Sequence, residues 1–214
     1  MKITAFQFNL FGVNTYVVWD PVSYEAAIID PGMSSELEQD TLSEFIATNS
    51  LKVTHLINTH LHIDHTLGND FVMRKYGVNT EADIQDGPLG ERRDSQAAMF
   101  HLRIPTPSPL KVDVALKNGD IIKIGNGVLR VIAVPGHSPG SIALYCPESC
   151  FVITGDALFQ GSVGRTDLPG GNHAQLIDSI RIRLMKLPGD TIVYPGHGPA
   201  TTIADELMYN PFLR

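Results

Sequence analysis

The amino-acid sequence predicts a layered α/β fold with chemically active side chains at the ends of its strands. Short runs rich in Val, Ile and Leu each stop at Gly, Pro or a polar cluster, as buried strands do; they occupy residues 51–59, 128–134, 151–154 and 191–194. Segments with a helical spacing of apolar residues lie between them. Each of the four runs leads directly to a residue that can bind a metal ion.

In the first part of the chain, the pattern predicts two strands and then a helix. Residues 16–19 and 25–30 are typical of adjacent strands and are joined by a turn-like Asp20-Pro-Val-Ser. Residues 34–47 begin with two serines and an acidic first turn. Apolar residues then follow at helical spacing, at Leu37, Leu42, Phe45 and Ile46. This pattern indicates a helix packed on a sheet.

Beyond the strand at 51–59, helices and strands continue to alternate. A helix is expected over residues 67–76, and another over residues 174–185. Residues 112–124 and 128–134 are typical of strands, and Asn126-Gly127 between them is a strong signal for a hairpin. The sequence therefore distributes strands and helices through both halves of the chain.

Three histidines are placed to bind one metal ion. His60 and His62 are two residues apart, so in an extended segment they point to the same side. With the distant His137, which follows another apolar run, they form the three-histidine set that suits zinc. A lone histidine after a strand is usually a surface residue, but so many candidate ligands after apolar runs favour a metal centre.

A second metal position is indicated by the residues that follow. Asp64 and His65 come where the backbone turns into a helix, so they can aim at a second ion together with His197. Asp156 suits a bridging role because one carboxylate can give an oxygen to each ion. Between ions about 3.5–4 Å apart, a water loses a proton near neutral pH and becomes a nucleophile. The predicted reaction class is metal-assisted hydrolysis.

These seven residues resemble the His-x-His-x-Asp-His, His, Asp, His pattern of metallo-β-lactamase-fold hydrolases. The segment 155–171, with Gly-Arg165-Thr-Asp167, and the ending 206–213 are similar to the small glyoxalase II-like (hydroxyacylglutathione hydrolase-like) branch. The resemblance covers nearly the whole chain. It implies one domain over residues 1–214, built as an αββα sandwich of two mixed β-sheets flanked by helices, with the metal ions in a groove along one edge.

The resemblance also implies hydrolysis of S-lactoylglutathione or a related acyl thioester by a metal-bridging hydroxide. The ion on His60, His62 and His137 would polarise the carbonyl, while the other ion steadies the nucleophile. Asp64 is expected to accept a proton as well as to bind metal. Two divalent ions are implied, with zinc expected and iron or manganese compatible with the same ligands. The chain ends soon after His197, so the helical extension that grips glutathione in full-length glyoxalase II enzymes is not expected here.

Other functions remain open at this point. A persulfide dioxygenase has the same fold and similar motif residues but one iron, expected on His60, His137 and Asp156. A lactonase would open acyl lactones with the same hydroxide. Outside the enzymes, the chain can be a metal-dependent binding or sensor module.

Composition and charge limit the classes of partner and the cellular location that we expect for the protein. The formal net charge is −7 and the chain has no dense Lys/Arg block, so no nucleic-acid partner is expected. The sequence contains neither an apolar run of membrane-spanning length nor a signal peptide at its start, so we expect no membrane partner and a cytoplasmic location. A small-molecule substrate remains as the expected partner, and the sequence leaves the oligomeric state unknown. Cys146 and Cys150 are expected to be reduced thiols outside the metal site.

Two further segments carry charged residues near the predicted site. Residues 83–110 contain many prolines and polar side chains, so they are unsuited to a central strand, and we interpret them as a lid over the groove. Their arginines, Arg92, Arg93 and Arg103, are either contacts for an anionic substrate or solvated surface charges. Arg165 and Asp167 are expected to form an ion pair that fixes the glycine-rich loop.

Overall fold

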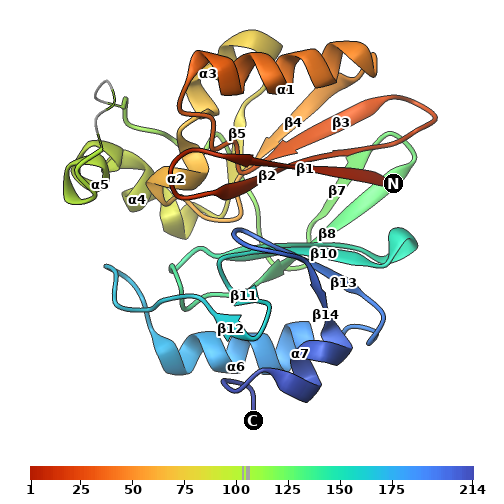
Figure 1. The fold of residues 1–214 in the computed structure, drawn as a ribbon, viewed down its shortest axis with the longest axis vertical. Helices are drawn as coiled ribbons and strands as arrows, with labels where there is room; N and C mark the ends of the chain where they lie inside the picture. The colour runs from red at the N-terminus through yellow and green to blue at the C-terminus, as the bar shows by residue number, and fades with distance from the viewer. Residues whose placement is uncertain (103, 105–106) are drawn as a thin grey trace.

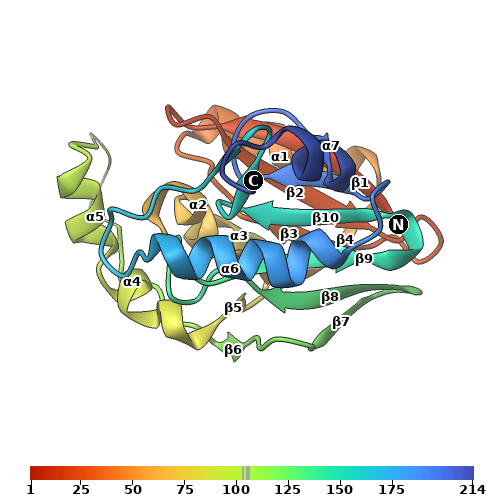
Figure 2. The ribbon, with the colours of Figure 1, turned by 90° about the horizontal axis from the view of Figure 1, so that it is seen from below.

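Two six-stranded sheets pack face to face in the computed structural model, which describes residues 1–102, 104 and 107–214. Helices α1 (Glu36–Thr48) and α3 (Asn69–Tyr76) lie outside the first sheet. Helices α6 (His173–Arg183) and α7 (Ile203–Tyr209) lie outside the second sheet (Figure 1). Seen from below, α6 and α7 extend across that sheet (Figure 2). The predicted α/β fold, an αββα sandwich of two mixed sheets, is confirmed.

The first sheet holds the strands of the first half of the chain in sequence order. They are β1 (Lys2–Phe8), β2 (Val13–Trp19), β3 (Glu25–Ile29), β4 (Lys52–Ile57), β5 (Thr80–Ala82) and β6 (Val114–Ala115). Pairing is antiparallel from β1 to β3 and parallel from β3 to β6. The strands predicted at 16–19, 25–30 and 51–59 are β2, β3 and β4. Strand β1 was not predicted, because it is an edge strand with most of its side chains partly exposed and a weak apolar signal.

Local capping explains where the helices of the first half begin and end. Ser35 and Glu38 form a reciprocal capping box at the start of α1, as its serines and acidic turn predict. Leu42 and Ile46 are buried against the sheet, but Leu37 is 77% exposed, so its assignment to the buried face was wrong. Helix α3 ends at Gly77 in the left-handed conformation that glycine adopts readily.

The segment that follows β5 is helical. It contains the short helices η1 (Ile84–Asp86), α4 (Gly87–Glu91) and α5 (Arg93–Met99), which agrees with the expectation that no central strand forms here. A single strand over 112–124 was wrong. The segment divides into β6 and β7 (Ile121–Ile124), which belong to different sheets, because a turn closed by Lys117 and Asp120 redirects the chain.

The second sheet is built from the other half of the chain, in the order β14-β13-β10-β9-β8-β7. Its remaining strands are β8 (Gly127–Ala133), β9 (Ile142–Cys146), β10 (Phe151–Gly155), β13 (Ile192–Pro195) and β14 (Thr201–Thr202). The hairpin between β7 and β8 lies at the predicted position, and β10 pairs in parallel with β13. A small separate hairpin, β11 (Leu158–Phe159) and β12 (Ser162–Val163), follows β10, and the short helices η2 (Pro147–Ser149) and η3 (Leu184–Lys186) complete this half.

The inward faces of both sheets form the central core. Tyr16, Ile29, Leu144 and Ile153 are among its buried side chains, and further apolar clusters lie between each sheet and its helices. Cys146 is buried in this core and Cys150 is exposed, and both are free thiols, as predicted. In the described part of the chain, we find no helix with both the length and the apolar character that crossing a bilayer requires.

His55 on β4 joins the first sheet to the edge strand β7 of the second. Its Nδ1 lies 2.6 Å from Glu81 Oε1, and its Nε2 lies 2.9 Å from the Lys123 carbonyl oxygen on β7. Both partners accept hydrogen bonds, so only the imidazolium form satisfies both. The hydrogen bond to Glu81 outweighs partial burial and raises the pKa of His55 above its ordinary value.

This contact makes part of the stability pH-dependent. A group whose pKa is raised by folding stabilises the protein fully below its unfolded pKa, and this contribution is lost as pH rises through the folded value. We expect His55→Gln to lower the free energy of unfolding by about 1–2 kcal/mol near pH ~5.5 and by clearly less near pH ~9. Urea unfolding of both proteins at the two pH values measures this. A difference that does not change with pH would contradict the assignment.

Candidate metal centre

All seven predicted ligands converge at one edge of the sandwich. The chain leaves β4 for His60 and His62, β8 for His137, β10 for Asp156 and β13 for His197. The short helix α2 (Ile63–Thr66) then carries the remaining two, Asp64 and His65, inward. The ends of strands from both sheets therefore supply one site.

The first cluster consists of His60, His62 and His137. His62 Nδ1 lies 2.8 Å from His137 Nε2, and His60 Nε2 lies 3.3 Å from the same atom. The three ligating nitrogens are all within 4.8 Å of one another. Nitrogens bound tetrahedrally to one zinc at ~2.0–2.1 Å stand about 3.3 Å apart. The observed spacing is therefore close to that of a ligand set.

The second cluster consists of Asp64, His65 and His197. His65 Nε2 and His197 Nε2 are 3.3 Å apart, and Asp64 Oδ2 lies 3.2 Å from His197 Nε2 and 3.7 Å from His65 Nε2. All three ligating atoms again lie within 4.8 Å of one another. This is a second, separate group that could hold a metal ion.

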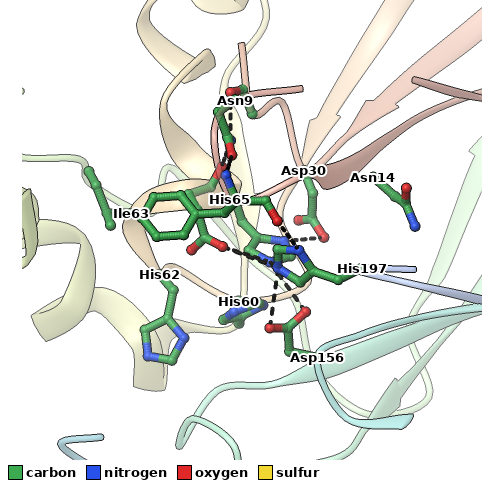
Figure 3. A network of polar contacts seen from close by, with 12 residues as sticks. Asn9, Asn14, Asp30, His60, His62, Ile63, His65, Asp156 and His197 are labelled. Carbon is green, nitrogen blue, oxygen red and sulfur yellow. Dashed lines mark hydrogen bonds and ion pairs between the residues drawn. The ribbon is translucent and has the colours of Figure 1, made fainter. Parts of the chain in front are cut away.

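Asp156 lies between the two clusters. Its Oδ1 is 3.3 Å from His65 Nε2, and its Oδ2 is 3.6 Å from His197 Nε2 and 3.7 Å from His137 Nε2. Figure 3 shows its carboxylate aimed at the rings of His65 and His197. The buried Oδ1 has no hydrogen-bond donor within the described residues. A carboxylate in this position can give one oxygen atom to a metal ion in each cluster.

Several histidines are oriented by a hydrogen bond from the ring nitrogen that faces away from the site. The other ring nitrogen then presents its lone pair to the site. His137 Nδ1 lies 2.7 Å from the carbonyl oxygen of Arg165, and His197 Nδ1 lies 3.1 Å from that of Phe11. A carbonyl only accepts, so each Nδ1 must carry the proton and each Nε2 presents a lone pair inward. Neutral imidazole nitrogens in this orientation are metal ligands.

Asp30 and Thr59 orient two more histidines, and the sequence analysis missed both. The Thr59 hydroxyl donates to Asp30 Oδ2 at 2.6 Å, so its lone pair is free to accept from His60 Nδ1, 3.1 Å away. Asp30 Oδ2 also lies 3.1 Å from His65 Nδ1. A signal was present, since Asp30 ends an apolar run and precedes Pro-Gly, much as Pro-Gly precedes His137 and His197.

Burial and neighbouring charges shift the pKa values of the ligands in two directions. Burial, then the neighbouring histidines, lowers the pKa of His60 well below its ordinary value, and burial lowers the pKa of His62 to about 3. Burial alone would lower the pKa of His65, but Asp156 and the other nearby carboxylates outweigh it and raise that pKa. Burial likewise opposes ionisation of Asp156, but His65 overcomes it and lowers the pKa of the carboxyl group. The neutral imidazoles of His60 and His62 and the ionised carboxylate of Asp156 are in forms that bind a cation, whereas the carboxylates around His65 draw positive charge to its position, as a proton or as a metal ion.

Asp86, which the sequence analysis also missed, accepts hydrogen bonds from both of the loops that carry the ligands of the first cluster. Its Oδ2 accepts from the backbone N–H of Leu61, which lies between two ligands, at 3.0 Å, and from Ser138 Oγ at 2.8 Å. Its Oδ1 accepts from the Gly140 N–H at 2.6 Å. The side chain is fully buried, and this burial outweighs the hydrogen bonds and raises its pKa. Asp86 therefore sets the spacing between the His60–His62 loop and the His137 loop.

The approach of His197 depends on a glycine and on contacts between the sheets. A Cβ on Gly196 would collide with the Asp156 carboxylate, so only glycine fits before His197. Asn14 on β2 donates its backbone N–H to Gly196 O at 2.7 Å, and Tyr16 OH donates to Pro195 O at 2.7 Å. The first sheet thus positions a ligand carried by the second.

A pocket of about 210 Å³ opens above the clusters. Besides ligands, it is lined by Phe11, Phe100, Arg165 and Leu168, and the rings of Phe11 and Phe100 meet edge to face at 5.6 Å. Arg165 forms the predicted ion pair, with two contacts of 2.7 Å to the Asp167 carboxylate. A small substrate can therefore reach the clusters through a partly aromatic opening.

The predicted lid, residues 83–110, forms a helical wall of this pocket through Phe100. Its arginines do not share one role. Arg93 is 1% exposed and contacts Asp70 Oδ2 at 3.1 Å and Thr66 O at 2.8 Å, so for this residue both alternatives, a substrate contact and a solvated surface charge, were wrong. Arg92 is exposed and lies outside the metal pocket. Arg103 lies outside the described residues.

Comparisons with known proteins agree with this architecture and this site. The sequence matches the family described as the Metallo-beta-lactamase superfamily over residues 8–197. The chain belongs to this superfamily. Members are mostly metal-dependent hydrolases, and the histidine and aspartate groups described above are consistent with the use of divalent metal.

Individual superfamily members resemble the chain over its full length. Hydroxyacylglutathione hydrolase GloC of Haemophilus influenzae is 36% identical, covering 100% of this chain and 98% of GloC. The crystal structure of BLEG-1 B3 metallo-beta-lactamase superposes with a TM-score of 0.89 at 32% identity, covering 99% of both chains. TTHA1623, solved in a di-iron-bound form, gives a TM-score of 0.85 at 37% identity and covers 98% of this chain and 100% of its own.

The contacts of Asp86 lead to a test of ligand spacing. In Asp86→Asn, an amide N–H would face one of the donors of Leu61, Ser138 or Gly140, so the two ligand loops should separate slightly. We expect metal affinity about 10–100-fold lower than in the wild type, measured by competition with a chelator. Asp83→Asn, a nearby change outside these contacts, should bind metal normally. Unchanged affinity in Asp86→Asn would contradict the positioning role.

Arg93 is expected to stabilise the folded protein. Arg93→Ala leaves the Thr66 and Ser108 carbonyl groups and Asp70 without their cation, so the free energy of unfolding should fall by at least about 2 kcal/mol. Arg92→Ala, an exposed neighbour, should change it by no more than about 0.5 kcal/mol. Thermal or urea unfolding of both variants decides this, and equal effects would show that the buried contacts of Arg93 contribute little.

Proposed function

We propose that the protein is a metal-dependent thioesterase of the glyoxalase II type, acting on S-lactoylglutathione or a related acyl thioester. The observation that carries the proposal is the pair of adjacent three-ligand clusters with Asp156 between them. Full-length similarity to the hydroxyacylglutathione hydrolase GloC supports the choice of substrate class.

The proposed ligands fall into two sets joined by Asp156. His60, His62 and His137 hold one ion, and Asp64, His65 and His197 hold the other. The inward lone pairs and the unpartnered buried Oδ1 of Asp156 fit two cations. Two divalent ions, zinc or alternatively iron or manganese, would supply polarisation of the thioester carbonyl and activation of water near neutral pH.

The protein itself holds the substrate and handles protons. Phe11 and Phe100 cover the opening of the pocket and limit access of bulk water to a bound thioester. Asp64, 3.2 Å from His197 Nε2, is the side chain we assign to accept a proton from the attacking water, in addition to its role as a ligand. The thiolate departs without help from a protein acid, since thiols ionise far more readily than amines.

A rival function rests on the same geometry. His60, His137 and Asp156 alone form a two-histidine, one-carboxylate set, with contacts of 3.3 Å and 3.7 Å, which suits a single iron in a persulfide dioxygenase. A lactonase would use both ions on a cyclic ester. Metal stoichiometry separates the dioxygenase from the other two functions.

The deciding experiment is elemental analysis of the purified protein followed by turnover assays on the same preparation. About two equivalents of metal and hydrolysis of S-lactoylglutathione or another acyl thioester would support the proposal. About one equivalent of iron with oxygen uptake on glutathione persulfide would replace it with the dioxygenase. Turnover of lactones or β-lactams with none of thioesters would also overturn it.

Loss of a ligand should remove metal and activity together. We expect His62→Ala and Asp156→Ala to retain less than about a hundredth of the wild-type kcat/KM on the best thioester and to lose bound metal. His173→Ala removes an exposed histidine at the start of α6 and should leave both unchanged. Full turnover by a metal-stripped preparation of the wild type would contradict the metal dependence.

A further inference from the structure

An apolar cleft lies beside the metal pocket and is larger than it. Its volume is about 340 Å³, against about 210 Å³ for the metal pocket. Its apolar lining comes from Pro88 and Leu89 of α4, Met99 of α5, Pro139 and Pro169, and the polar side chains of Gln85, Arg92, Ser95 and Gln96 also line it. Met99 is 54% exposed. Apolar side chains that gather around one exposed depression mark a binding site more often than chance surface exposure.

The walls of the cleft continue into the metal pocket. Met99 lines the cleft and the next residue, Phe100, lines the metal pocket. Pro169 lines the cleft and its neighbour Leu168 lines the metal pocket. Pro139, also in the cleft, stands two residues after the ligand His137. A molecule held at the metal clusters can therefore extend one arm into the cleft.

The cleft is held rigidly against the ligand loops. Gln96 donates to Leu89 O at 2.8 Å and accepts from the Ile63 N–H at 3.0 Å, so α4, α5 and α2 are tied together. Pro139 stands between Ser138 and Gly140, both of which contact Asp86. A cleft formed in advance lowers the entropy lost when a chain binds.

We propose that this cleft binds an apolar hydrocarbon chain of the substrate, so that the preferred substrates are acyl thioesters with such a chain rather than glutathione conjugates. This inference rests on the proposed thioesterase function. Glutathione carries two carboxylates and an ammonium group, and Arg92 is the one charged side chain among the described residues that line the cleft, so the mostly apolar lining would leave at least one carboxylate and the ammonium group without a charged partner. A hydrocarbon chain loses only contact with water when it enters.

The test is a series of thioesters with increasing chain length. N-Acetylcysteamine thioesters from acetyl to octanoyl place the chain on the acyl side, and acetyl thioesters of alkanethiols place it on the thiol side. We expect kcat/KM to rise about three- to fourfold per methylene in one of the two series until the cleft is filled. A rise in either series supports the cleft and identifies the arm. Flat profiles in both series, with thioesters still hydrolysed, overturn the cleft and leave the proposed function standing.

Two exposed residues from separate lining segments, Met99 and Pro169, test the cleft itself. Met99→Glu and Pro169→Asp place a charge in it, and each should lower the ratio of octanoyl to acetyl kcat/KM, or the corresponding thiol-series ratio, by at least about tenfold. Met208→Glu changes a methionine that is 61% exposed on α7, far from the cleft in sequence and on the outer face of the second sheet, and should leave the ratio unchanged. An unchanged ratio in both wall variants overturns the cleft assignment.

Binding measurements separate the cleft from the reaction. Dethia ketone analogues, in which a methylene replaces the thioester sulfur, resist hydrolysis and can be titrated into the metal-loaded protein by calorimetry. An affinity that rises with chain length in the wild type, and is lower in Met99→Glu, supports the cleft. If no thioester is hydrolysed in that case, only the proposed reaction is wrong. Affinity that does not depend on chain length overturns the cleft whether or not thioesters are hydrolysed.

Discussion

The convergence of five imidazoles and two carboxylates on one small space is the constraint on which the rest of the structure depends. Their lone pairs face one another at 2.8–3.7 Å, an arrangement that is unfavourable without a cation between them. Four of the five rings are therefore held from outside: His197 and His137 by the carbonyl groups of Phe11 and Arg165, His65 by Asp30, and His60 by Thr59. These holders come from loops far apart in the sequence, so the whole sandwich contributes to the site.

The two sheets are tied together at the same edge that carries the ligands. Asn14 N–H bonds to Gly196 O at 2.7 Å, Ile142 N–H bonds to Thr59 O at 2.8 Å, and Asp86 joins the loops at Leu61 and Gly140. Each of these ties includes a residue that lies within three positions of a ligand. A shift of one sheet against the other would displace ligands directly. The packing of the central core therefore determines the geometry of the site.

The sequence alone predicted the features that repeat or cluster. Buried strands show as apolar runs, and ligands stand where such runs end, so the four strand ends and all seven converging side chains could be named in advance. It could not identify β1, whose edge position leaves little apolar pattern, or the turn at Lys117–Asp120 that divides one apparent strand between two sheets. It also missed Asp30, although the place of Asp30 at the end of an apolar run was a signal, and Asp86, because a carboxylate that accepts from backbone N–H groups has no sequence motif. Arg93 was misassigned because a charged residue in a polar run gives no sign that it will be buried.

The helical segment between β5 and β6 serves two purposes, which meet at Gln96 and are otherwise carried by different side chains. Its inward side chains, Asp86, Arg93 and Gln96, bond to the loop and helix that carry His60 to His65, so a change there would move ligands. Its outward side chains, such as Met99, line the cleft and bear on no ligand-bearing backbone. Substitutions on the outer face can therefore alter which chain the cleft accepts while the metal geometry stays fixed. Substrate preference can therefore change while the seven ligands stay in place, because Met99 lines the cleft and the side chains that bond to the ligand-bearing segments are different ones.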